Sequence, residues 1–222
     1  MFCRWILRKN RQDQTFCKKI LWSDESRFCN NGWFNRNIHY RWTDENQHFH
    51  RETAFQERFG INVWLGILDS KVIGPFFFEE NLSGEMYLNF LRNDFQDMLD
   101  DLPLIVNRNF QYFQQDGAPA HRDRRCTRFL NNFLPNRWIG NNGPISWPPR
   151  SPDLTPLDFS IWGYIKDLVY KTTPLNVDDL KHKIQAACNK ISPRMLQNIQ
   201  LRVIENARSC LRNNGGHFQH LK

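Results

Sequence analysis

The 222-residue sequence has no apolar run long enough to cross a membrane and no pair of cysteines at metal-binding spacing. A membrane helix needs about 18 or more largely apolar residues in a row, and the first residues also lack the apolar core of a secretory signal. We therefore expect neither a membrane span nor secretion. The six scattered cysteines, without any CxxC pair, favour reduced thiols in a cytosolic or nuclear protein over zinc ligands.

Internal repeats, low-complexity tracts and an obvious interdomain linker are also missing. Hydrophobic residues make up 40% and aromatic residues 14% of the chain, which excludes a disordered polymer. This length suits one large domain, or a domain with a small annex. The net charge of +7 is compatible with a polyanionic partner, but an ordinary basic, solvated surface would have the same charge.

Three aspartates stand in three separate blocks: Asp24 in ILWSDESRF, Asp116 in FQYFQQDGAPAH and Asp158 in SPDLTPLDFSIWGYIK. The first two follow strand-like apolar runs, and the third opens a stretch of helical period. Folding of these elements against one another would bring the three carboxylates to one point. Ligand sets made only of oxygen suit Mg²⁺ or Mn²⁺.

These blocks, in this order, resemble the catalytic domain of the Tc1/mariner superfamily of transposases. The resemblance runs from about Ile20 to the C-terminus and includes the blocks GEMYLNFL, NRWIG, PISWPPRSPDLTPLDF and GGHFQHL. Residues 117–157 form a gap of 41 between the second and third aspartates, which resembles a DD41D-type branch. The third acid is Asp, as in mariner, rather than the Glu of Tc1.

The resemblance implies an α/β, RNase H-like fold with a mixed central sheet flanked by helices. It implies residues 1–17 as an N-terminal remnant, 18–172 as the catalytic core and 173–222 as a helical annex of the same domain. Asp24, Asp116 and Asp158 would be the catalytic residues and would hold two Mg²⁺ or Mn²⁺ ions for DNA cleavage and strand transfer. The implied partners are transposon-end and target DNA and a second copy of the chain, and the implied location is the nucleus.

The residue pattern predicts strands over 18–28, 33–42, 61–78, 110–115 and 145–147. The stretch 61–78 is expected to be broken at Gly66, at Asp69-Ser70 and at Gly74-Pro75. Apolar residues at helical spacing predict helices over 84–103, 124–134, 157–168, 177–191 and 193–211. Strands followed by alternating helices and strands are the order of parts in an RNase H-like fold.

Each aspartate also has a purely structural interpretation. Asp24 would pair with Arg27 at a strand end, and Asp116 before Gly117 would set an Asx-turn. Asp158 would sit favourably in the first turn of a helix that Thr155 caps and Pro156 begins. Capping and metal binding are compatible. The alternative third ligand is Asp153.

His121 and four nearby arginines are candidate DNA contacts. His121 would touch a phosphate or polarise the site, or it would only bond the backbone of a turn. The arginines would neutralise phosphates near the metal site or form a solvated helix face; they are Arg122, Arg124, Arg125 and Arg128.

Members of this superfamily normally carry N-terminal helix-turn-helix modules, for which there is no room before the first predicted strand of this chain. The resemblance therefore implies a truncated, element-derived transposase without sequence-specific recognition. A DNA-binding relic without catalysis is the alternative from another class. An RNase H-type ribonuclease is the enzymatic alternative, and preference for an RNA–DNA hybrid over duplex DNA would distinguish it.

Overall fold

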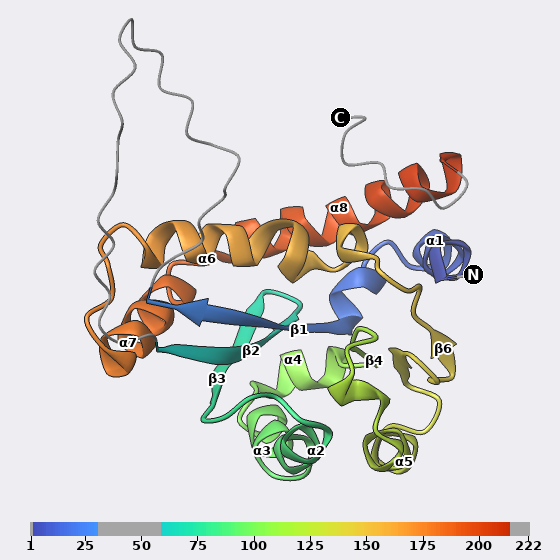
Figure 1. The fold of residues 1–222 in the computed structure, drawn as a ribbon. Helices are drawn as coiled ribbons and strands as arrows, with labels where there is room; N and C mark the ends of the chain where they lie inside the picture. Colours follow the sequence, from blue (N-terminus) through green and yellow to red (C-terminus); the bar gives the residue numbers. More distant parts are fainter. Residues whose placement is uncertain (1, 31–58, 214–222) are drawn as a thin grey trace, which may run out of the picture.

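The structure is a computed structural model that describes residues 2–30 and 59–213. Its centre is a six-stranded mixed sheet (Figure 1) with the order β3-β2-β1-β4-β5-β6. The strands are β1 (Ile20–Cys29), β2 (Gly60–Leu68), β3 (Lys71–Phe78), β4 (Tyr112–Gln114), β5 (Trp138–Gly140) and β6 (Ile145–Ser146). The strand predicted for residues 33–42 lies outside the described residues.

Strand β1 is the long central strand, and it separates an antiparallel half of the sheet from a parallel half. It pairs antiparallel with β2, and β2 pairs antiparallel with β3, which confirms the predicted meander. On its other side β1 runs parallel to β4, and β4, β5 and β6 are parallel in turn. The carboxyl ends of β1 and β4 therefore lie at the same edge of the sheet.

Two of the three predicted breaks in the meander were wrong. Only the turn at Asp69-Ser70 separates β2 from β3, whereas Gly66 and Gly74-Pro75 lie inside the strands. Gly66 sits at a shift in the β2–β3 register, and a Cβ there would lie 2.8 Å from the Trp64 side chain. This glycine lets an aromatic ring pack over the strand instead of ending it.

Helices cover both faces of the sheet (Figure 1). One face packs against α2 (Gly84–Arg92), α3 (Asp94–Asp100) and α5 (Arg124–Phe133), around a core that includes Trp64, Phe90 and Phe113. The other packs against α1 (Phe2–Gln12), α6 (Trp162–Val169), α7 (Val177–Cys188) and α8 (Pro193–Arg212). None of the described helices is both long and apolar enough to span a membrane.

The predicted helix over residues 84–103 is two helices. The chain leaves helical geometry at Asn93, whose ψ is −82°, and α3 starts at the next residue. Pro103 ends this region as expected, but it also precedes α4 (Leu104–Asn109), which the sequence analysis did not predict. Strand β5 was also missed, because three residues are too few to show a strand period.

The first helix belongs to the same core as the last one. Phe2, Cys3 and Ile6 of α1 are buried in the cluster that also contains Val203 and Ala207 of α8. The predicted boundaries at residues 17 and 172 therefore do not coincide with any separation of the hydrophobic core. Division of the chain at these positions stays a prediction.

Candidate active site

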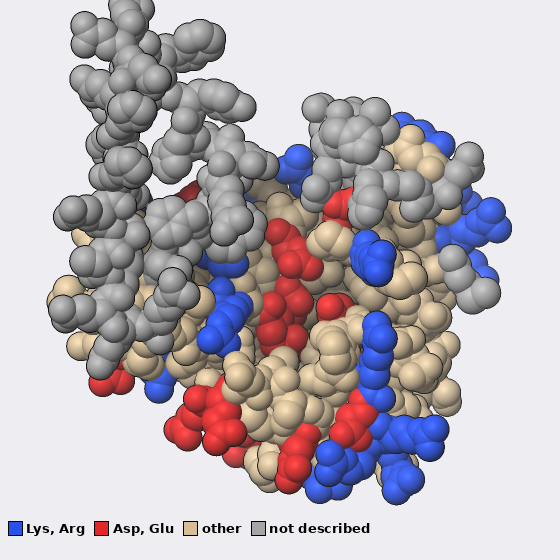
Figure 2. All heavy atoms as spheres, in the orientation of Figure 1, with Lys and Arg blue, Asp and Glu red and all other residues tan. Residues whose placement is uncertain are grey.

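The three aspartates come from three segments that meet where β4 ends beside the middle of β1. Trp22 of β1 is opposite Gln114, the last residue of β4, so Asp24 within β1 and Asp116 just beyond β4 each follow two residues later. Asp158 lies in the π-helical turn η4 (Leu157–Ile161), which contacts β1 and leads into α6. Acidic side chains gather in the middle of this face of the molecule (Figure 2), with Lys and Arg on either side.

Asp24 is the most deeply placed of the three, with 6% of its surface exposed. Its Oδ2 accepts a hydrogen bond of 2.7 Å from the indole Nε1–H of Trp162 in α6. Burial raises the pKa of Asp24 well above its usual value, and the charges of Asp158 and Glu25 raise it further, against the Trp162 bond. A nearby cation would favour the charged form of this acid.

The Asp158 side chain hydrogen-bonds to the Asp24 carboxyl group. Burial raises the pKa of Asp158; the bond to Asp24 opposes this, and the charge of Asp116 adds to it. Lys166, two turns further along α6, is near enough for its charge to act on both acids. The ionisation of each carboxyl group therefore depends on the charge of the other.

Asp116 has the opposite character. Its Oδ1 accepts bonds of 2.8 Å from the Ala118 backbone N–H and 2.7 Å from Nδ1 of His121. Burial opposes ionisation, but the hydrogen bond and charge of His121 outweigh it and lower the pKa of Asp116. Asp116 is therefore an ionised carboxylate, as a metal ligand must be.

His121 lies between two carboxyl groups. Its Nδ1 contacts Oδ1 of Asp116 at 2.7 Å, and its Nε2 contacts Oε2 of Glu25 at 3.1 Å. Carboxylates only accept hydrogen bonds, so both ring nitrogens donate. Burial lowers the pKa of His121, but the charge of Glu25 and the bonds to both acids raise it to about 10.

The donor set fits a divalent cation. Besides burial, the charges of Glu25 and Asp116 raise the pKa of both Asp24 and Asp158, and oxygen ligands suit Mg²⁺ or Mn²⁺. Among the described residues, the potential ligand atoms that lie within 4.8 Å of one another belong to Glu25, Asp116 and His121. That group overlaps the predicted triad only at Asp116, and its members are already bonded to one another.

The structural interpretations of the aspartates have different outcomes. Arg27 donates a 3.0 Å bond to Oδ1 of Asn81. It is not among the described groups that shift the pKa of Asp24, so the predicted pairing of Asp24 with Arg27 is not found there. The Asx-turn at Asp116 is present through Ala118 and coexists with the site. The predicted helix start is present: Thr155 has extended backbone, Pro156 is the first residue with helical geometry, and the Thr155 carbonyl accepts a 3.1 Å bond from the Phe159 N–H.

The alternative ligand Asp153 lies in the turn just before the helical turn that carries Asp158, and the two turns contact each other. It belongs to the short 3₁₀ turn η3 (Pro152–Leu154) and is 5% exposed. Its backbone carbonyl accepts a 2.7 Å bond from Nδ2 of Asn206 in α8. The segment is thus tied to the C-terminal helix.

The predicted DNA contacts divide into buried and exposed residues. His121 is 1% exposed and both ring nitrogens are engaged, so the structure places it inside the site rather than on a surface that a duplex can reach. Arg122, Arg124, Arg125 and Arg128 are exposed. Arg125 pairs with Asp123 at 2.8 Å, while Arg122 is near enough to Asp116 to lower its pKa.

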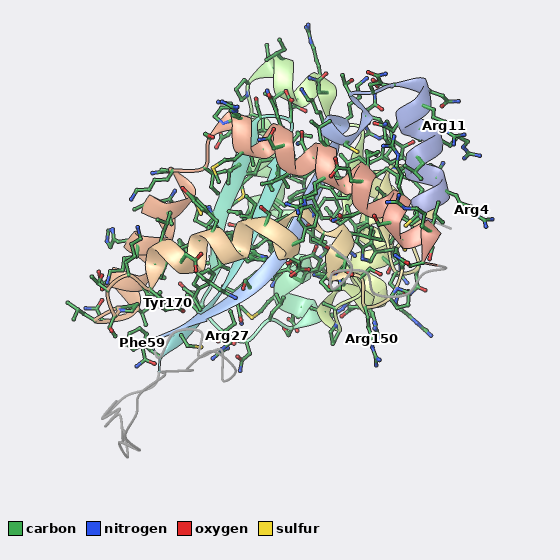
Figure 3. The ribbon with its side chains drawn as sticks, turned by 90° about the horizontal axis from the view of Figure 1, so that it is seen from above. Arg4, Arg11, Arg27, Phe59, Arg150 and Tyr170 are labelled. Atoms are coloured by element: carbon green, nitrogen blue, oxygen red, sulfur yellow. The ribbon has the colours of Figure 1, made fainter. Side chains whose placement is uncertain are left out.

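Two further arginines flank the site. Figure 3 shows Arg27 and Arg150 extending from the same side of the molecule, whereas Arg4 and Arg11 extend from the end formed by α1. Arg27 belongs to β1 itself, and Arg150 follows Pro148-Pro149 in the loop before Asp158. Both are exposed. The sequence analysis did not select either, because a single arginine in a basic chain carries no pattern.

Glu25 and Trp162 were also missed, although the sequence held a signal for each. Side chains alternate across a strand, so Glu25 had to point to the face opposite Asp24. Trp162 is four residues after Asp158, the spacing that places two side chains on one face of a helix. Neither signal identifies the partner, which depends on how the helices pack against the sheet.

No family model matches the chain. Among curated proteins it is similar to the transposable element Tc3 transposase of Caenorhabditis elegans, with 27% identity over 188 residues and 82% of this chain covered. In sequence and fold the chain resembles a Tc1/mariner transposase catalytic domain. It spans about half of that relative, 52% of its length.

Solved structures of Mos1 transposase match the Tc1/mariner-like fold of this chain. The crystal structure of the Mos1 mariner catalytic domain has a TM-score of 0.73 at 15% identity, covering 98% of this chain and 92% of the other. A pre-cleavage Mos1 transpososome has a TM-score of 0.77 at 17% identity, covering 98% and 62%. The predicted RNase H-like fold is thus confirmed.

Proposed function

We propose that this chain is the catalytic domain of a DNA transposase that cleaves and joins DNA strands with divalent metal ions. The convergence of Asp24, Asp116 and Asp158 at one edge of the sheet is the observation that carries this proposal. The likeness to Tc3 transposase supports it. Structures of Mos1 complexes with a transposon end and of its catalytic domain with Mg or Mn give it further support.

The three aspartates would hold two Mg²⁺ or Mn²⁺ ions. Such ions stabilise the charge that develops on the attacking and leaving oxygens of a phosphodiester. Asp116 is the acid that ionises most readily, whereas burial and like charges oppose ionisation of Asp24 and Asp158, which a bound cation would favour. Trp162 keeps one oxygen of Asp24 in place at 2.7 Å, so that its carboxylate does not rotate freely.

Exposed arginines on both sides of the acids would bind the phosphates of the DNA backbone. Arg27 and Arg150 extend from the same side of the molecule (Figure 3), and Arg27 follows Asp24 by three residues in β1. Arg122 adds a positive charge near Asp116. Contacts of this kind position a duplex without reading its sequence. We place this activity in the nucleus, on transposon ends and target DNA, with two copies of the chain cooperating.

The test is nicking of supercoiled plasmid by the purified chain in Mn²⁺ and in Mg²⁺. We expect metal-dependent nicking that Asp116→Asn lowers by at least about 100-fold, because an amide is a poor ligand for these ions. Asp153→Asn is the matched control, since it changes a nearby acid outside the proposed triad and should retain activity.

Two outcomes would support other functions. Equal behaviour of wild type and Asp116→Asn, both folded and both binding DNA, would favour a DNA-binding relic without catalysis. Cleavage of an RNA–DNA hybrid in preference to duplex DNA would favour a ribonuclease with the same metal chemistry.

A further inference from the structure

The arrangement around His121 calls for an explanation beyond metal ligation. The imidazole is 1% exposed, yet it lies within 3.1 Å of Glu25 and 2.7 Å of Asp116. A buried histidine between two acids on separate strands fixes their relative position. Glu25 is on β1, and Asp116 follows β4.

We propose that Glu25 and His121 form a clamp that positions Asp116 for metal binding, and that neither is itself a ligand. This inference rests on the proposed function of the site. In the clamp, Glu25 orients the imidazole through Nε2, and the imidazole orients the Asp116 carboxylate through Nδ1. His121 and Glu25 are thus positioning residues.

The clamp determines which oxygen of Asp116 faces the ion. Both the Ala118 N–H and His121 Nδ1 bond to Oδ1, at 2.8 Å and 2.7 Å. With Oδ1 held by two donors, Oδ2 is the oxygen that Asp116 presents to a cation. Partners that hydrogen-bond to metal ligands fix the ligand's orientation, and their loss typically weakens metal binding by about 10- to 100-fold.

The imidazole is also held against rotation by its neighbours. The ring of Tyr87 in α2 packs on it with centroids 4.2 Å apart, and the Tyr87 hydroxyl donates a 2.8 Å bond to Oε1 of Gln115. The short turn η2 (Ala120–Arg122) returns the chain so that His121 faces Asp116 across five residues. Because the ring is held in this way, its bonds to Glu25 and Asp116 keep these two acids at a fixed distance from each other.

Successive side chains of β1 point to opposite faces of the sheet, so the adjacent acids Asp24 and Glu25 have different neighbours. Ile20 and Trp22 face the core under α6, and Leu21 faces the core under α2. Asp24 accordingly meets Trp162 of α6, and Glu25 meets His121 on the α2 side. Glu25 therefore reaches Asp116 through His121, from the face of the sheet opposite Asp24.

The clamp is tested by measuring the binding of Mn²⁺ alone to the full chain with isothermal titration calorimetry. We expect His121→Ala to weaken Mn²⁺ binding about 10- to 100-fold. His121→Gln should recover part of the loss, because its amide N–H can still donate to Asp116. Glu25→Gln should bind almost as wild type, since its amide oxygen still accepts from His121.

Asp116→Asn distinguishes failure of the clamp from failure of the site. If Asp116→Asn binds Mn²⁺ as tightly as wild type, the proposed metal site itself is wrong. If Asp116→Asn loses binding and His121→Ala does not, only the clamp is overturned. A loss in Glu25→Gln as large as in Asp116→Asn would make Glu25 a direct ligand and would also overturn the clamp.

Thermal unfolding in EDTA separates positioning from a general structural role. Reduced metal-free stability of His121→Ala with unchanged Mn²⁺ affinity would contradict the proposal. Reduced affinity in His121→Gln at wild-type metal-free stability would support it, because folding alone does not explain such a change.

Discussion

At the scale of single residues, this site shows how strongly position decides the properties of a carboxyl group. Asp24 and Asp116 are chemically identical, yet burial and like charges raise the pKa of the first, whereas His121 lowers that of the second. Their motifs alone did not distinguish them. The difference arises from neighbours on other elements, namely Trp162 and Asp158 for one acid and His121 for the other.

The bond between Trp162 and Asp24 leads to a prediction about stability. Trp162→Phe keeps an aromatic ring beside Phe28 but removes the donor to a buried carboxyl oxygen. We expect the free energy of unfolding in EDTA to fall by about 1–3 kcal/mol, the usual cost of a buried unsatisfied group. Urea unfolding followed by circular dichroism measures this change.

A double-mutant cycle identifies the origin of that cost. In an Asp24→Ala background the acceptor is gone, so Trp162→Phe should cost less than it does in the wild type. The same cost in both backgrounds would show that lost packing, and not the hydrogen bond, is responsible.

At the scale of elements, helix starts and strand periods determine most of the observed boundaries. The predicted helix over 193–211 is α8, with Ser192 accepting a bond from the Met195 N–H and Pro193 in the first turn. The π-helical turn that carries Asp158 was not predicted, since its widened geometry leaves no mark in the residue pattern. Such turns are frequent at functional sites.

The cap of α8 can be tested by substitution. Ser192→Ala removes the side-chain acceptor at the start of the helix and should lower the free energy of unfolding by about 1 kcal/mol. Ser209→Ala, in the last turns of the same helix, is the matched control and should be neutral or slightly stabilising, because alanine has the higher helix propensity. Equal losses in the two variants during urea unfolding would contradict the role of Ser192 as a cap.

At the scale of the whole molecule, the two ends of the described chain share one core. The first helix packs against α8, and both contribute to the cluster on the α6 side of the sheet. Asp158 begins the segment that leads into this layer, and Asn206 of α8 holds the turn just before it. The packing of α1 and α8 therefore supports the position of the third acid.

Ile6 tests whether the first helix contributes to this core. It is fully buried, so Ile6→Ala should lower the free energy of unfolding by about 2–5 kcal/mol. Arg4→Ala is the control on the exposed side of the same helix and should change it by less than about 0.5 kcal/mol. If Ile6→Ala were as mild as Arg4→Ala in urea unfolding, the contribution of the first helix to the core would be contradicted.

The sequence by itself determined much of the strand–helix order, the antiparallel meander and the three candidate aspartates, because each depends on local period or on a short block of residues. The tertiary structure decided what surrounds those aspartates. Glu25, His121 and Trp162 reach them from β1, η2 and α6, far apart in the chain. Their charges and hydrogen bonds act through space, so only the packing of these elements decides which acid has a raised pKa and which a lowered one.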